Sequence, residues 1–379
     1  MVAGCSSDEA RTLDASPDGR VDSQNGDCGW TVPLGDDKVL WVVCDPTALP
    51  GGLSNSVAVA DPADRRPAFQ LANFVDPAPQ DLGRCSDRGG AASWIDGVTA
   101  APGPEPATTL VTAFFVHGCR ASLLDRDDPG DFGVATYVYR HGSTDPWTAQ
   151  VHRWDLFPGA WSTGERNVTF GAGAVYSDGH QYAYGCHPDE RPDWVGEQQC
   201  AVVRAAVGQP VGVRASWEVW RGPDDGWVAC TIDDPADQDC TEGAFRRALE
   251  AAAPMDMPLP GGEGTDGFTP QQFSVSWSER LEAFVSAAPR TFGDPTLRIR
   301  AADAPEGPWS EPGDVPVECD PEAVDGGFNC YHFAPHPSLG DTASMPFGFH
   351  DAGHEGPADV ALVSVPWCEL ADLVGRPCP

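Results

Sequence analysis

Two aspartates of this chain could share acid and base chemistry. Asp27 stands directly before Cys28, and Asp45 directly after Cys44. A hairpin turn centred on Asp36 would pair the two cysteines and place the two aspartates opposite each other on the other face of the ribbon. Carboxylates held this close shift each other's pKa, which can give one site a general acid and a general base. The hairpin therefore predicts a catalytic pair; the alternatives are a hydrogen-bonded turn pair and a set of calcium ligands.

Other polar residues stand near the starts of predicted strands. Glu165 follows a flexible Ser-Thr-Gly segment and is the best candidate for a third catalytic acid; an exposed loop glutamate is the alternative. If the strand starts converge on one axis, they would bring together aromatic rings, amides, basic groups and carboxylates, a set that suits a sugar. The residues predicted to bind such a substrate are Trp30, Asp96, Arg166, Asn167, Gln272 and His332. For Asp96 a simple turn aspartate is the alternative.

A metal site has weaker support in the sequence. His332 and His336 could hold a metal ion at the base of an axial channel, but polar core residues are the simpler interpretation. The sequence has no HExxH pair, Walker loop, GxSxG elbow or EF-hand spacing. We therefore expect no metal and no cofactor, and a structural calcium ion in the axial channel stays open as an alternative.

The cysteines indicate an oxidising compartment. Of the 13 cysteines, setting Cys5 aside leaves an even number without the paired CxxC spacing of a zinc site. Only the first pair has a register argument; the others follow nearest-neighbour order. The predicted pairs are Cys28 with Cys44, Cys85 with Cys119, Cys186 with Cys200, Cys230 with Cys240, Cys319 with Cys330, and Cys368 with Cys378. Disulfides of this kind persist in exported proteins.

Cys5 lies in Val-Ala-Gly-Cys-Ser-Ser, which resembles the lipobox of a bacterial lipoprotein. In that interpretation Cys5 would be acylated and residues 6–25, which lack apolar periodicity, would form a polar tether. The basic and apolar segments that precede a lipobox are missing, so we expect a truncated signal. A stray cysteine in a disordered tail is the alternative.

The composition favours an all-β protein. Among 379 residues, 42 are Gly and 37 are Pro, and only 21% are charged, so short strands joined by turns are expected. From about Gly26 onward, strand-turn-strand phrases recur five times, which is typical of a five-bladed β-propeller. One helical stretch, at 241–253, would be an insertion between blades, with disulfides stapling the loops. We expect residues 26–379 to form a single domain.

The net charge excludes several partners. A formal charge of −34 arises from 57 acidic and 23 basic residues scattered through turns. This argues against nucleic acid and anionic lipid as ligands. No apolar run approaches the roughly 20 residues that span a bilayer, so a membrane contact would depend on the anchor at Cys5. We expect a monomer.

Several sequence segments resemble those of a known protein family. The hairpin from Asp27 to Thr47, the Asn55–Ala58 strand, the pair Phe170–Val175 and Tyr182–Gly185, and Gly307–Trp309 resemble the bacterial propeller family called domain of unknown function 4185. Some members of that family are endo-acting hydrolases that cut D-arabinan. The resemblance covers about residues 26 to 368 and implies that Asp27 and Asp45 stand where the family keeps its acidic hairpin residues.

Together these features predict an exported propeller of the bacterial cell envelope, lipid-anchored or secreted. It would hydrolyse a polysaccharide, with D-arabinan as one candidate, through Asp27, Asp45 and Glu165. The main alternative is a catalytically inactive propeller that binds carbohydrate or serves adhesion at the cell surface. A metal-dependent enzyme that uses His332 and His336 is the third class.

Overall fold

The computed structural model describes most of the chain. The described residues are 19–21, 28–46, 49, 52–120, 131–157, 169–188, 198–229, 240–253, 255, 274–290, 294–319, 330–351 and 359–379.

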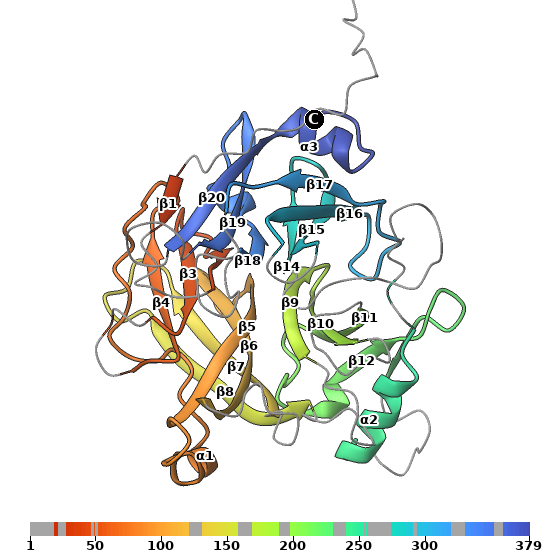
Figure 1. Cartoon of the computed structure of the whole chain (residues 1–379). Helices are drawn as coiled ribbons and strands as arrows, with labels where there is room; N and C mark the ends of the chain where they lie inside the picture. Colours follow the sequence, from red (N-terminus) through yellow and green to blue (C-terminus); the bar gives the residue numbers. More distant parts are fainter. Residues whose placement is uncertain are drawn as a thin grey trace, which may run out of the picture.

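The described strands form five antiparallel sheets arranged as the blades of a β-propeller (Figure 1). Blade I holds β2 (Trp30–Pro33), β3 (Val39–Cys44) and β4 (Asn55–Ala60), and blade II holds β5 (Ala91–Pro102), β6 (Thr108–Cys119), β7 (Asp131–Arg140) and β8 (Trp147–Phe157). Blade III holds β9 (Thr169–Ser177), β10 (His180–Pro188), β11 (Gln198–Ala206), β12 (Trp217–Trp220) and β13 (Trp227–Ala229). Blade IV holds β14 (Ser274–Ser278), β15 (Ala283–Pro289), β16 (Thr296–Ala302) and β17 (Gly313–Pro316). Blade V holds β18 (Tyr331–Pro335), β19 (Ser344–Asp351) and β20 (Asp359–Pro366), with β1 (Gly19–Val21) at its edge. The predicted fold class is confirmed.

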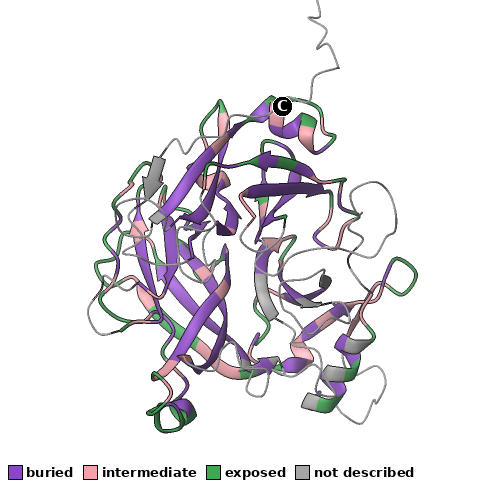
Figure 2. Cartoon of the chain, viewed as in Figure 1, coloured by how far each residue is buried: buried purple, intermediate pink, exposed green. Residues whose placement is uncertain are grey.

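The apolar core lies between neighbouring blades. Val285 and Ile299 of blade IV share one buried cluster with Phe347 and Val363 of blade V. The strands are accordingly buried along most of their length, while exposed residues gather in the connections (Figure 2). Strands covered on both faces carry continuous apolar runs, as β3 does, with every residue buried. Packing between blades therefore fixes the ring of inner strands β2, β5, β9, β14 and β18.

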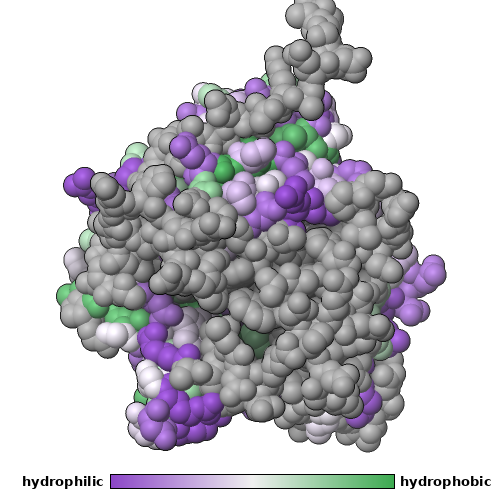
Figure 3. Space-filling model, viewed as in Figure 1, coloured by the Kyte–Doolittle hydropathy of each residue, from purple (hydrophilic) through white to green (hydrophobic). Residues whose placement is uncertain are grey.

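Three α-helices accompany the strands in the described ranges. The predicted helical insertion contains α2 (Glu242–Glu250), whose N-terminus is capped by the Thr241 side chain, which accepts from the N–H of Ala244. Two further helices, α1 (Pro79–Arg84) and α3 (Trp367–Leu373), were not expected, so the prediction of a single helical stretch was wrong. On the face seen in Figure 3, the described surface around α1 is hydrophilic.

The start of the structure also differs from the prediction. β1 lies inside the segment expected to be a tether and pairs antiparallel with β20, Gly19 opposite Leu362 and Val21 opposite Val360. An N-terminal strand thus completes the last blade, and this pairing covers the free edge of β20.

Four of the predicted disulfides are confirmed. They are Cys28–Cys44, Cys85–Cys119, Cys319–Cys330 and Cys368–Cys378. Cys200 and Cys240 are disulfide-bonded as well. Cys186 lies opposite Cys200 in the β10–β11 register, but its side chain is outside the described part, as are Cys230 and the predicted lipidation site Cys5. None of the helices in the described ranges is long and apolar enough to span a bilayer.

Candidate functional site

The opening hairpin has the predicted register. Trp30 pairs with Val42 and Val32 with Leu40, so the turn is centred on Asp36. The Cys28–Cys44 disulfide closes the open end of the ribbon with a Cα–Cα distance of 5.1 Å. Asp27, the first member of the predicted catalytic pair, lies outside the described residues.

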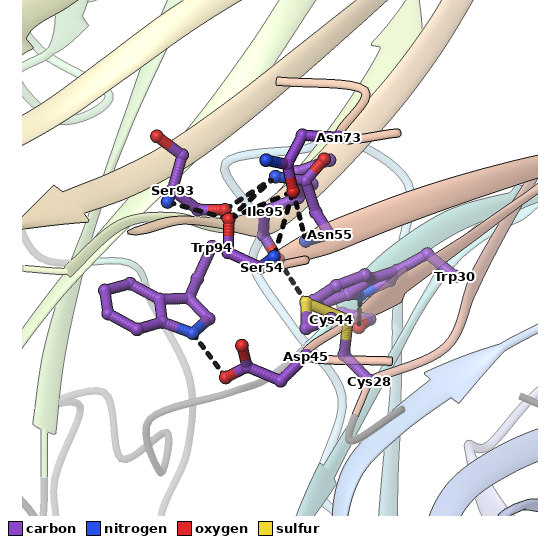
Figure 4. The surroundings of a disulfide bond; sticks show 11 residues. Cys28, Trp30, Cys44, Asp45, Ser54, Asn55, Asn73, Ser93, Trp94 and Ile95 are labelled. Carbon is purple, nitrogen blue, oxygen red and sulfur yellow. Dashed lines mark hydrogen bonds between the residues drawn. A yellow bond between two sulfur atoms is a disulfide. The ribbon is translucent and has the colours of Figure 1, made fainter. Parts of the chain in front are cut away.

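Asp45 is bound on both carboxylate oxygens. The indole N–H of Trp94 donates to Oδ2 at 2.6 Å, and the Arg120 guanidinium forms an ion pair with Oδ1 (Figure 4 shows the Trp94 contact). Arg120 also donates to the carbonyl of Gly52 at 3.0 Å, and its guanidinium carbon lies 5.9 Å from the centre of the Trp94 ring. The carboxylate thus takes one charge-assisted hydrogen bond on each oxygen, one of them within an ion pair. The geometry therefore suits Asp45 for holding Trp94 and Arg120 in place.

A buried asparagine, Asn55, joins blade I to blade II (Figure 4). Asn55 is fully buried; its Nδ2 donates to the carbonyls of Val75 and Ser93 at 2.8 and 2.7 Å. Its Oδ1 accepts from the N–H groups of Phe74 and Val75 at 2.8 and 2.9 Å. The amide thus fixes the loop that leaves blade I and the start of the inner strand β5.

Asp96 lies on β5 where the strand bulges. The β5–β6 register shifts between Ile95 and Gly97, so Asp96 is the extra residue of the bulge. It is half-buried, and the next residue, Gly97, lines the axial cavity described below. Bulges often lie next to active sites, where they re-aim a side chain.

Trp30 and His332 meet where their inner strands begin. The Trp30 indole donates to Ser274 Oγ at 3.0 Å, and its ring meets the His332 imidazole edge to face, with centroids 5.4 Å apart. Burial, with a smaller effect from His350, lowers the pKa of His332 to about 3. A neutral imidazole can bind a hydroxyl group but brings no positive charge to the site.

His336 is a core residue. It is fully buried, its Nδ1 is hydrogen-bonded to Thr31 Oγ1 at 2.8 Å, and its ring lies 5.3 Å from that of Trp41. Throughout the described ranges, no three His, Cys, Asp or Glu side chains are grouped closely enough to hold a metal ion.

An axial cavity of about 1020 Å³ runs along the inner strands. Each inner strand contributes to its wall, among them through Trp30, Gly97, Gly173, Ser274 and Pro335. Cavities of this size commonly hold small molecules in proteins.

The structure brings together part of the predicted site. Trp30, Asp96 and His332 belong to inner strands around the axis, whereas Asp45 is engaged by Trp94 and Arg120. Glu165, Arg166, Asn167 and Gln272 lie outside the described residues.

Sequence reasoning missed three contributors, Asn55, Trp94 and Arg120. One feature of the sequence could have indicated Asn55: it is a polar residue at the start of an otherwise largely apolar strand. Nothing in the sequence linked Arg120 to Asp45, because 75 residues separate them.

Comparisons with known proteins support the fold. No protein-family model matches the sequence, and no curated protein matches it. A solved structure named "putative hydrolase", from Bacteroides ovatus ATCC 8483, is 16% identical, with 95% of this chain and 89% of that chain covered and a TM-score of 0.52. Trypanosoma rangeli sialidase is 10% identical (93% and 58% covered, TM-score 0.46), and an exo-1,5-alpha-L-arabinanase from a bovine ruminal metagenomic library is 9% identical (93% and 94% covered, TM-score 0.42). At such identities the first similarity shows a shared fold, and the two weaker ones carry no argument about function.

Proposed function

We propose that the protein is a glycoside hydrolase that cleaves a polysaccharide where its inner strands begin. The observation that supports this most is the bulge of β5 at Asp96, which directly precedes Gly97, a residue that lines the axial cavity together with Trp30. A carboxylate can transfer protons during glycosidic cleavage, and an indole ring can stack on a sugar face. Asp96 thereby moves from the predicted substrate-binding set to the proposed catalytic set.

The remaining roles follow from the sequence and from the contacts of Asp45. Asp27 and Glu165 stay the proposed partner acids, because each stands just before a strand that begins at the axis. Asp45 is a positioning residue, since Arg120 and Trp94 engage its oxygens. The family resemblance makes D-arabinan the first polymer to test, and the confirmed disulfides support export.

Digestion of purified polysaccharides tests this proposal. The protein is incubated with D-arabinan, L-arabinan, xylan and galactan, and released oligosaccharides are separated by chromatography. Variants Asp27→Asn, Asp96→Asn and Glu165→Gln should each lose at least about 100-fold in rate, which is typical for loss of a proton-transfer group. The matched control is Asp224→Asn in the exposed turn between β12 and β13.

Two outcomes would refute the assignment. The first is a folded wild type that releases no product from any polymer; if it still bound one, the carbohydrate-binding alternative would apply. The second is full activity in Asp96→Asn, which would remove Asp96 from the reaction.

A further inference from the structure

The axial cavity also reaches the end of the ring opposite to the proposed catalytic site. Its lining includes residues of the turns that leave the inner strands. We call this end the turn-end mouth and define it by Asp37, Lys38, Asp178, Trp277, Glu279 and Arg280.

Trp277 is unusually accessible for a tryptophan of this chain. It is 38% exposed, whereas Trp30, Trp94 and Trp367 are each at most 8% exposed. Its ring meets Phe284, another residue of the cavity lining, at a centroid distance of 4.9 Å. A large aromatic ring that stays accessible at the rim of a cavity is typical of a ligand platform.

Two carboxylates of the mouth are available to a ligand. Across the described ranges, the side chains of Asp178 and Glu279 take part in no hydrogen bond or ion pair, and both residues are exposed. By contrast, Lys38 is engaged by Asp61 at 2.6 Å, and Arg280 lies over the Trp367 ring at 5.5 Å. The two carboxylates of the mouth are therefore free acceptors beside an aromatic surface.

The charge of the mouth selects among ligands. Asp37, Asp178 and Glu279 outnumber Lys38 and Arg280, so an anionic ligand would be repelled. A neutral saccharide fits both features, because its hydroxyl groups donate to carboxylates and its C–H face packs on an indole ring.

We propose that the turn-end mouth is a second binding site, which takes a neutral saccharide on Trp277. Asp178 and Glu279 accept hydrogen bonds from the hydroxyl groups of the sugar. The site lies apart from the proposed catalytic residues. Its ligand class is inferred from the exposed Trp277 ring and the excess of carboxylates at the mouth. Binding here needs no cleavage, so this proposal and the proposed hydrolase activity can fail separately.

Indole NMR gives a readout specific to this site. The full-length chain carries Asp96→Asn to prevent cleavage and is labelled with ¹⁵N-tryptophan; the Trp277 signal is assigned by its loss in Trp277→Phe. Arabinohexaose, xylohexaose and hexagalacturonic acid serve as probes. At least one neutral hexaose should shift the Trp277 signal saturably, and hexagalacturonic acid should bind at least about ten-fold more weakly.

Variants of the carboxylates complete the test. The double change Asp178→Asn with Glu279→Gln should weaken the neutral probe by about ten-fold or more, through the loss of charge-assisted hydrogen bonds, while Asp224→Asn leaves the affinity unchanged. The proposal is overturned if no neutral probe moves the Trp277 signal. It is also overturned if hexagalacturonic acid binds as well as the neutral probes, or if the double variant binds like its parent.

Discussion

Asp45 and Asn55 are polar residues of blade I whose bonds reach into blade II. Asp45 engages the indole of Trp94, and Asn55 bonds to the carbonyl of Ser93. Both contacts are made to the stretch of β5 just before Asp96. Blade I, whose hairpin was predicted to supply catalytic groups, is thus bonded to the inner strand that carries Asp96.

The Asn55 amide should be critical for stability. In Asn55→Ala the carbonyls of Val75 and Ser93 and the N–H groups of Phe74 and Val75 lose their partner in a buried place. Each such loss costs about 1–3 kcal/mol, so we expect the free energy of unfolding to fall by ~3 kcal/mol or more. Urea unfolding measures this.

Asn55→Asp is the informative comparison for that prediction. It keeps the acceptor oxygen but removes the two N–H donors. Its free energy of unfolding should fall for two reasons: the buried carbonyls of Val75 and Ser93 lose their donors, and a charge is placed in the core. If Asn55→Ala unfolded at the same urea concentration as wild type, the amide would not be holding this junction.

His336 should make stability depend on pH. Burial, and to a smaller degree Arg65, lower its pKa from 6.5 to about 3. Between these values the unfolded chain binds a proton that the folded chain does not, so stability is present above pH 6.5 and is lost as pH falls toward 3. The slope is ~1.4 kcal/mol per pH unit for this group.

Urea unfolding of wild type and His336→Asn at pH 7, 6 and 5 checks this dependence. The asparagine keeps a polar atom for Thr31 but does not titrate, so the variant should lose less stability on acidification than wild type. Parallel pH profiles for the two proteins would show that His336 is not the source.

At the scale of elements, the sequence predicted those features that depend only on residues close together in the chain. The Asp36 turn set the register of β2 and β3 because a hairpin of fixed turn centre has only one pairing. β1 and α1 were missed because a strand of three residues and a helix of six carry too few positions for a periodic pattern. The bulge at Asp96 arises from pairing with β6, which begins 12 residues later, so no local signal marks it.

The pairing of β1 with β20 should stabilise the ring. A chain that starts at residue 19 keeps this strand, whereas a chain that starts at residue 22 lacks it and exposes the edge of β20. The loss of a few backbone hydrogen bonds, about 0.5–1.5 kcal/mol each, should lower the melting temperature by roughly 2–5 °C. Calorimetry of the two truncated chains compares them directly; equal melting temperatures would show that β1 contributes nothing to closure.

At the scale of the whole molecule, recurrence in the sequence predicted the five blades, but the grouping of side chains at the axis was only partly predictable. Trp30 and His332 were both assigned to the starts of inner strands, which lie on one side of a propeller, and their rings are in contact there. The contact of Arg120 with Asp45 depends on how blade II packs against blade I, which the sequence does not encode locally. The turn-end mouth has the same origin, since its residues come from separate blades.

The net charge should make stability depend on salt. A charge of −34 in one compact chain repels itself at pH 7, and ions screen that repulsion over about 10 Å at 0.1 M salt. We expect the melting temperature at pH 7 to rise by a few degrees between roughly 0.02 and 0.3 M NaCl. At pH 4.5, close to the isoelectric point of 4.3, the rise should be much smaller because the net charge is nearly zero.

Choline chloride at the same ionic strength should act like NaCl. A rise of equal size at both pH values would contradict charge repulsion as the cause, and a rise confined to CaCl₂ would instead indicate a bound calcium ion.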